Sequence, residues 1–121
     1  MAGGVKVFFD GGCRPGGMEW AVVIRGEAIV ACDLGAGTSM EAEWLALLAA
    51  LRLVRERRIA DAVLLGDAAA VIAQARGEVR CPPAYREHLD TFHALGGAHL
   101  RLRYLRRAQN LAGIALDALR R

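Results

Sequence analysis

Short apolar runs alternate with turn residues along the first part of the chain. Residues 5–10, VKVFFD, are rich in β-forming side chains and lie between two glycine pairs, which is typical of a buried strand. Residues 20–25 and 27–32 are two further apolar runs, and they meet at Arg25-Gly26, a dipeptide suited to a tight hairpin. This region therefore predicts an antiparallel meander of three strands.

Helical spacing follows the meander. Thr38 and Ser39 can cap a helix that starts near Glu41, and leucines then recur on one face of it. A short apolar run at 62–65 predicts a fourth strand, and alternating apolar and basic residues at 99–105 predict a fifth. Further helices are expected at 68–76, at 84–95 and from Asn110, as its cap, to the C-terminus.

The order β-β-β-α-β-α-α-β-α predicts an α/β fold with a mixed sheet and helices on its faces. We expect residues 1–121 to form a single domain, because no linker, repeat or low-complexity tract interrupts the pattern. The composition is 55% hydrophobic, which supplies enough apolar material for one sizeable core.

Composition and charge limit the location and the partners. Charged residues break the apolar runs before they reach the roughly 18–20 residues of a membrane span, so we expect no membrane insertion. With no secretory signal pattern, and three cysteines that lack metal-ligand spacing, we expect a cytoplasmic protein with free thiols. The net charge of +3 comes from residues 61–121, which carry nine arginines against six acids. This excess permits a nucleic-acid-binding face, and a solvated basic surface is the alternative.

Three acidic residues lie at predicted element boundaries. Asp10 ends the first strand, Asp67 follows the fourth, and Glu43 lies in the first turn of the first long helix. If the first and fourth strands are parallel neighbours, Asp10 and Asp67 share one edge of the sheet, where ligand crevices of α/β folds form. A helix that crosses these strands can direct Glu43 to the same point.

Clustered carboxylates repel one another unless a cation lies between them. Divalent cations such as Mg²⁺ prefer oxygen ligands, and two ions about 4 Å apart can clamp a phosphodiester during an in-line displacement. Taken one at a time, the same acids are equally well explained as turn, cap or helix-dipole residues. Only their convergence favours a metal site.

Four segments, in order, resemble the type 1 ribonuclease H family. FFDGGCRPGG resembles the family's first strand and glycine loop, and TSMEAEWLALLAAL resembles its Thr-Asn-Asn-x-Ala-Glu-Leu helix start. LLGDAAAVI resembles its Asp-Ser-x-x-Val-Ile segment, and LRRAQN resembles the Pro-Arg-x-x-Asn entry to the last helix in members that lack the catalytic-loop histidine. The resemblance covers nearly the whole chain. It implies a ribonuclease H-like fold, with a five-stranded mixed sheet (a three-stranded antiparallel meander plus two parallel strands) and helices on both faces.

The resemblance also implies an activity, metal-dependent endonucleolytic cleavage of the RNA strand of RNA–DNA hybrids. Asp10, Glu43 and Asp67 would be the catalytic acids and would also bind Mg²⁺ or Mn²⁺. Two ions would be present when substrate is bound, and Asp10 would bridge the two ions. The 2′-hydroxyl groups of the RNA strand distinguish it from DNA. Gly11 and Gly12 have no side chains, so they would leave space for the nucleic-acid backbone to come close. The residues implied to contact the nucleic acid are Gly11, Gly12, Cys13, Thr38, Ser39, Arg107 and Asn110.

The chain departs from the family at the fourth acid. The family has an aspartate four residues after the asparagine of the last motif, and here that position is Ile114. Asp117 follows three residues later, about 60° around the helix and about 4.5 Å along it. Asp117 is therefore either a displaced fourth catalytic acid or a solvated acid of the last helix. Ser39 and Met40 replace two asparagines, and the basic protrusion of some members is missing.

These departures predict weakened or more metal-demanding catalysis and leave two alternatives open. The first is a catalytically impaired module with the same fold that binds nucleic acid or protein. The second keeps the fold and changes the substrate, as in exonuclease or Holliday-junction-resolvase relatives.

Overall fold

The structure is a computed structural model, and it describes residues 4–119. The strands are β1 (Val5–Arg14), β2 (Gly17–Ile24), β3 (Glu27–Ala31), β4 (Ala62–Gly66) and β5 (Arg101–Tyr104). The helices are α1 (Ser39–Glu56), α2 (Ala69–Ala75), α3 (Arg86–Ala94) and α4 (Leu111–Leu119). Short 3₁₀ helices are η1 (Pro83–Tyr85), η2 (Gly97–His99) and η3 (Arg107–Gln109).

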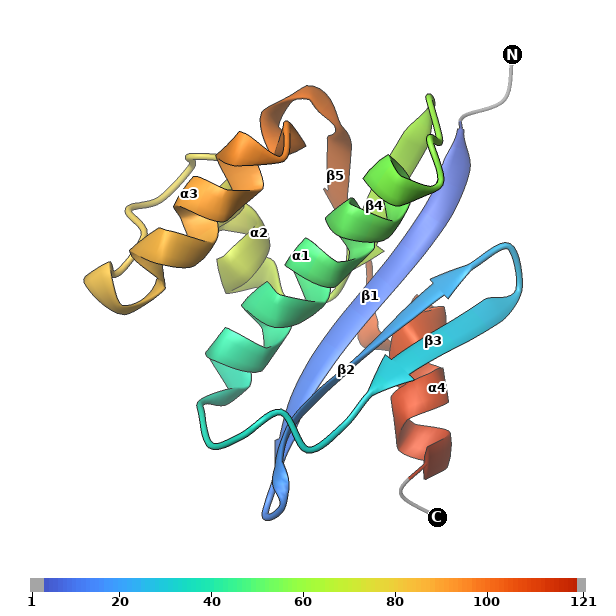
Figure 1. Cartoon of the computed structure of the whole chain (residues 1–121), viewed down its shortest axis with the longest axis vertical. Coiled ribbons are helices and arrows are strands. Elements are labelled where there is room, and N and C mark those ends of the chain that lie inside the picture. Colours follow the sequence, from blue (N-terminus) through green and yellow to red (C-terminus); the bar gives the residue numbers. More distant parts are fainter. Residues whose placement is uncertain (1–3, 120–121) are drawn as a thin grey trace.

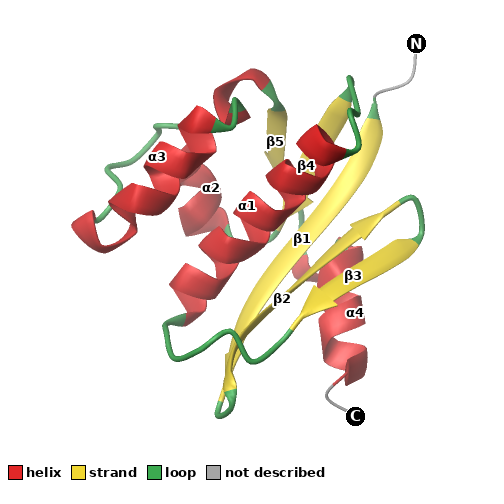
Figure 2. Cartoon of the chain, in the orientation of Figure 1, coloured by secondary structure: helices red, strands yellow, loops and turns green. Residues whose placement is uncertain are grey.

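The strands form one five-stranded sheet in the order β3-β2-β1-β4-β5 (Figure 1). The pairs β1–β2 and β2–β3 are antiparallel, whereas β1–β4 and β4–β5 are parallel. Helices α1, α2 and α3 lie on one side of the sheet, and α4 covers the other side behind β1 and β2 (Figure 2). The predicted mixed sheet with helices on both faces is confirmed.

The hairpin between β2 and β3 forms where the sequence predicts it. Arg25 has φ 52° and Gly26 has φ 81°, and positive φ at both central residues is the hallmark of a tight turn whose twist matches that of the flanking strands. The helix expected at 84–95 is divided between η1 and α3. The strand expected at 99–105 is shorter, because residue 99 belongs to η2.

Strand β1 continues past the point where the sequence predicts its end. The expectation that it stops at Asp10 is wrong, because its ladder with β2 runs on through Gly11 and Gly12 to the pair Arg14↔Gly17. Backbone hydrogen bonds hold this extension, so it needs no apolar side chains. The turn follows at the Pro-Gly sequence after Arg14.

The position of Asp10 follows from the unequal lengths of β1 and β4. Their parallel pairing ends at Phe8↔Leu65, so β1 runs on beyond the carboxyl end of β4 and remains paired only with β2. Asp10 lies in this overhang, and Asp67 comes directly after β4. The parallel pairing on which the convergence of the two acids depends is therefore present.

The main core lies between the sheet and α1. The Thr38 hydroxyl caps this helix by accepting the Glu41 N–H at 3.0 Å, as predicted. Trp44 and Leu47 are among the α1 side chains that are completely buried in this core, where the Trp44 ring contacts His88 and Phe92 of α3. Among residues 4–119, no helix combines the length and apolar character that crossing a membrane requires.

A smaller cluster holds α4 on the opposite face. Ala112 and Leu116 are fully buried against β2 residues, including Ala21. Asn110 caps α4, because its Oδ1 accepts the Ala112 N–H at 3.1 Å, so the predicted cap is confirmed. Since apolar burial fixes α4 against β1 and β2, it also fixes the segment that precedes the helix.

Gly11 marks the point where α1 crosses β1. A Cβ at this position would overlap the Ala42 carbonyl and would lie 2.7 Å from the Glu43 nitrogen. The first turn of α1 therefore fills the space beside Gly11. Close helix packing is thus one reason for a glycine here, and the predicted contact of Gly11 with nucleic acid stays a prediction.

We expect Gly11→Ala to destabilise the protein by about 2 kcal/mol, because the added methyl group forces α1 away from β1. Urea denaturation measures the change. Gly16→Ala is the matched control, since its Cβ would meet its nearest neighbour, an Asp33 oxygen, at 3.4 Å. Equal stability of the two variants would contradict the close approach of α1 to β1.

Candidate active site

Three carboxylates from three elements meet at the edge of the sheet. Asp10 comes from β1, Glu43 from the first turn of α1, and Asp67 from the residue after β4. One oxygen atom from each lies within 4.8 Å of the others. Among the residues that the structure describes, no other group of three potential ligand residues comes this close. We call Asp10, Glu43 and Asp67 the acidic cluster.

Backbone contacts orient Glu43 in the cluster. The Gly11 N–H donates a hydrogen bond of 2.9 Å to Glu43 Oε1. This bond exists because Gly11 allows the first turn of α1 to lie against β1. The glycine and the acid, 32 residues apart in the chain, therefore act as one structural unit.

Asn110 ties the start of α4 to the same edge of the sheet. Its Nδ2 donates to the Phe9 carbonyl at 3.0 Å and to Asp67 Oδ1 at 3.4 Å. The residue is fully buried. Its amide positions Asp67 and α4 inside the protein, and the contact with nucleic acid that the sequence suggested for Asn110 stays a prediction.

Arg107 reaches into the acidic cluster from η3. Its Nη1 donates to Asp10 Oδ1 at 2.8 Å and to Asp67 Oδ2 at 3.3 Å, and its Nη2 donates to Asp117 Oδ1 at 3.3 Å. A Cβ at Gly113 would lie 3.1 Å from Nη1, so the glycine leaves the guanidinium room to lie close to Asp10. The sequence suggested that Arg107 contacts phosphate. It did not indicate that the Arg107 guanidinium lies between Asp10, Asp67 and Asp117.

The electrostatics show an excess of negative charge. Burial raises the pKa of Asp10 to about 6, although Arg107 lowers it, and Asp67 adds to the rise. Burial, reinforced by the charge of Asp10, raises the pKa of Glu43 to about 8. Burial alone would lower the pKa of Arg107, but Asp10 and Asp67 raise it above its usual value. One guanidinium does not compensate three carboxylates.

The acidic cluster fits a divalent metal ion. Carboxylate oxygens are the ligands that Mg²⁺ and Mn²⁺ prefer. The raised pKa values of Asp10 and Glu43 mean that burial and mutual repulsion disfavour the ionised carboxylates. A cation of higher charge than a guanidinium removes that penalty.

The last helix lacks an acid at the expected fourth position. Ile114 is 53% exposed. The side chain of Asp117 is 51% exposed and reaches Asp10 through the shared guanidinium of Arg107. The structure thus places Asp117 at the rim, outside the acidic cluster.

The remaining predicted contact residues lie on the surface near the start of α1. Cys13 is exposed, and its thiol donates to the Gly37 carbonyl at 3.1 Å, which holds the segment before α1 beside β1. Thr38 and Ser39 are exposed at the first turn of α1. The Thr38 hydroxyl also lies 2.9 Å from the Tyr85 hydroxyl.

One further buried acid near this site, Glu19, is not among the residues that the sequence motifs indicate. Glu19 is only 3% exposed, and it pairs with Gly12 in the register of β1 and β2, two positions from the pair Asp10↔Ala21. Since side chains alternate along a strand, Glu19 and Asp10 face the same side of the sheet, toward α4. A single acid within the otherwise apolar run of β2 is the signal that marks it.

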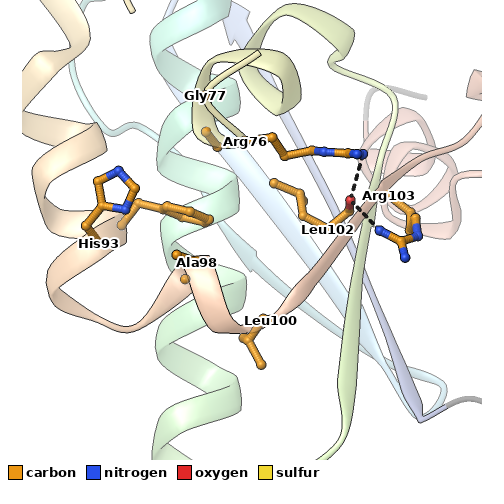
Figure 3. A pocket seen from close by; sticks show the side chains of 10 residues that line it. Arg76, Gly77, His93, Ala98, Leu100, Leu102 and Arg103 are labelled. Atoms are coloured by element: carbon orange, nitrogen blue, oxygen red, sulfur yellow. Dashed lines mark hydrogen bonds between the residues drawn. The ribbon is translucent and has the colours of Figure 1, made fainter.

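A separate hollow of about 300 Å³ lies between α2, α3 and β5 (Figure 3). Its floor is apolar, and the guanidinium groups of Arg76 and Arg103 both donate to the Leu102 carbonyl, at 3.3 and 3.5 Å. Arg76 also pairs with Glu78 at 3.1 Å. The bond from Arg76, the residue that ends α2, links this helix to β5, whereas Arg103 and Leu102 are neighbours within β5. Within the described part of the chain, the lining of the hollow carries no carboxylate, so it offers no site like the acidic cluster.

Several solved structures that this chain resembles over most of its length are RNase H1 proteins or RNase H domains. The ribonuclease H1 of Halobacterium salinarum matches with a TM-score of 0.79 and 26% identity, covering 96% of this chain and 97% of that chain. The N-terminal RNase H domain of Rv2228c from Mycobacterium tuberculosis matches with a TM-score of 0.75 and 23% identity, covering 97% and 96%. LC11-RNase H1, isolated from compost by a metagenomic approach and solved in complex with an RNA/DNA hybrid, matches with a TM-score of 0.73 and 18% identity, covering 88% of each chain.

No protein-family model matches the sequence, and no curated protein matches it. The structural similarity to RNase H1 proteins nevertheless extends over nearly the full chain, at low identity. The chain has the ribonuclease H-like fold, which confirms the fold that the sequence motifs implied.

We expect Glu43→Gln to stabilise the metal-free protein by about 1–2 kcal/mol at pH 9. The pKa of Glu43 is about 8 in the folded chain against an ordinary 4.5, so the folded state binds the proton more tightly and stability falls as pH rises through this window. Glutamine keeps an acceptor for the Gly11 N–H and carries no charge. Urea denaturation in chelator at pH 4 and pH 9 measures the difference, which should vanish at pH 4. An equal gain at both pH values would show that the charge of Glu43 is not the cause.

Proposed function

We propose that this chain is a metal-dependent endonuclease that hydrolyses the RNA strand of RNA–DNA hybrids. The observation that carries the proposal is the acidic cluster, located beyond the carboxyl end of β4 in a ribonuclease H-like fold. A structural relative of this chain, LC11-RNase H1, has been solved with an RNA/DNA hybrid, which supports the substrate class.

Asp10, Glu43 and Asp67 are the catalytic acids and the metal ligands in this proposal. Asp10 occupies the central position, because it is the most deeply buried of the three and contributes to the raised pKa of Glu43. Mg²⁺ or Mn²⁺, bound as two ions with substrate, would polarise the scissile phosphate and lower the pKa of the attacking water. The carboxylates need to be held rigidly for this role.

The protein's own contacts provide that rigidity. The Gly11 N–H holds Glu43, and the Asn110 amide holds Asp67. Burial of Asp10 in β1, between β2 and α4, leaves its side chain 2% exposed. The three carboxylates are therefore oriented before substrate arrives, and binding energy is not spent on ordering them.

The exposed residues at the start of α1 are proposed to contact the nucleic acid. Cys13, Thr38 and Ser39 present small exposed polar groups near the start of α1, at a size that suits close approach to RNA sugars and their 2′-hydroxyls. Gly12 lies next to them on β1. Arg107 is half exposed and can turn from the acidic cluster to a phosphate.

A second candidate function is a binding module with an impaired site. The observation that favours it is Ile114, an exposed apolar side chain at the position of the fourth acid. Such a module binds hybrid with the salt dependence of phosphate contacts and does not cut it. Cleavage assays in Mg²⁺ and in Mn²⁺ separate the two functions.

We expect Asp10→Asn to lower kcat/KM for cleavage of an RNA–DNA hybrid by roughly 10³-fold, because it removes the central negative charge of the site. Asp61→Asn is the matched control, since Asp61 lies before β4, at the end of that strand opposite Asp67, where it pairs with Arg101. A gel assay with labelled RNA strand measures both variants. The nuclease proposal fails if the wild-type protein binds hybrid and never cuts it in either metal.

We expect Ile114→Asp to raise the Mg²⁺-dependent cleavage rate about tenfold, because it restores an acid at the fourth position. The site tolerates the change, since Ile114 is exposed and lies in the first turn of α4, where a negative charge is favourable. Leu111→Asp, at another exposed apolar position of α4, is the control. No gain from Ile114→Asp, combined with strong loss from Asp117→Asn, would assign the fourth role to Asp117.

A further inference from the structure

Arg107 occupies the place of a cation in the acidic cluster. Its Nη1 is shared between Asp10 Oδ1, at 2.8 Å, and Asp67 Oδ2, at 3.3 Å. Its side chain is 51% exposed, whereas those of Asp10 and Asp67 are 2% and 8% exposed. The arginine thus enters the cluster from the solvent side and supplies positive charge to two buried carboxylates.

A divalent ion bound in the acidic cluster and this guanidinium would both draw on the carboxylates of Asp10 and Asp67. An Mg²⁺ ion binds a carboxylate oxygen at about 2.1 Å, shorter than the hydrogen bond that Arg107 makes to Asp10 Oδ1. The two cations would lie within a few ångströms of each other in a buried setting, where like charges repel strongly. With Arg107 in the position described above, the metal ion and the guanidinium therefore do not bind Asp10 and Asp67 at the same time.

The structure offers the guanidinium a second position. Its Nη2 already donates to Asp117 Oδ1 at 3.3 Å, and the side chain of Asp117 is 51% exposed. Gly113 lies beneath the guanidinium and carries no side chain that would block its movement. Arg107 can therefore leave Asp10 and Asp67 while it keeps its contact with Asp117.

We propose that Arg107 is a displaceable internal counter-ion, which holds Asp10 and Asp67 together in the metal-free protein and is driven toward Asp117 when a divalent ion binds. The inference rests on the metal site of the proposed function. In this inference Asp117 is the ion-pair partner of the displaced Arg107, and it is not a metal ligand. Since coupling is reciprocal, the arginine that stabilises the metal-free site lowers its affinity for metal.

Isothermal titration calorimetry with Mg²⁺ tests the proposal on the full chain at pH 8.5, where protons compete least with the metal. We expect Arg107→Gln to bind Mg²⁺ about five- to tenfold more tightly than wild type, the size of effect that loss of a partly exposed ion-pair network produces. Arg106→Gln is the matched control, because Arg106 is exposed and is the next residue in the chain. Its affinity should equal that of wild type.

The outcomes separate this inference from the proposed function. If wild type binds Mg²⁺ and Arg107→Gln binds it equally or less tightly, the counter-ion inference is wrong and the nuclease proposal stands. If neither protein binds Mg²⁺ or Mn²⁺, the metal site itself is wrong and both fall.

A measurement on wild type keeps the test independent of variant folding. The NMR signals of the Arg107 guanidinium should shift with the same midpoint as Mg²⁺ binding, because the contact with Asp10 is lost. Unchanged signals at saturating Mg²⁺ would overturn the displacement.

Discussion

The contact between the first turn of α1 and the backbone of β1 at Gly11 is the constraint on which the site depends. It needs a residue without a side chain on β1, since a Cβ there would overlap the Ala42 carbonyl. In return, the Gly11 N–H comes within 2.9 Å of Glu43 Oε1. The same close contact therefore packs α1 against the sheet and orients the Glu43 carboxylate. A change in the packing of this part of the core would also change the site.

The same arrangement has an electrostatic cost. Asp10 and Glu43 are drawn into a region where burial and mutual repulsion raise their pKa values to about 6 and about 8. Hydrogen bonds from Gly11 and Asn110 and the ion pairs of Arg107 offset part of this cost. The part of the electrostatic cost that these contacts do not offset favours the binding of a cation. A buried acidic site can in this way combine a stable fold with affinity for metal.

The sequence predicts those features that depend on local periodicity and on general rules of chain topology. The turn at Arg25-Gly26, the Thr38 cap and the convergence of Asp10 with Asp67 follow from turn chemistry, capping and parallel strand pairing. It does not predict the extension of β1, because a backbone ladder leaves no hydrophobic signature. Nor does it predict the contact of Arg107 with Asp10, which joins residues 97 positions apart through packing of α4 against the sheet.

The absence of an acid at position 114 and the presence of Arg107 in the acidic cluster both affect the balance of negative and positive charge around Asp10. A fourth carboxylate near Asp10 would add negative charge that a single guanidinium compensates even less, and would favour a metal ion over the arginine. With Ile114 pointing to solvent, the balance moves toward the ion pair. Arg107 and Ile114 both belong to the segment that Asn110 anchors against β1 and Asp67. Changes in this short segment therefore alter the charge that the site presents to metal and leave the sheet, which carries Asp10, unchanged.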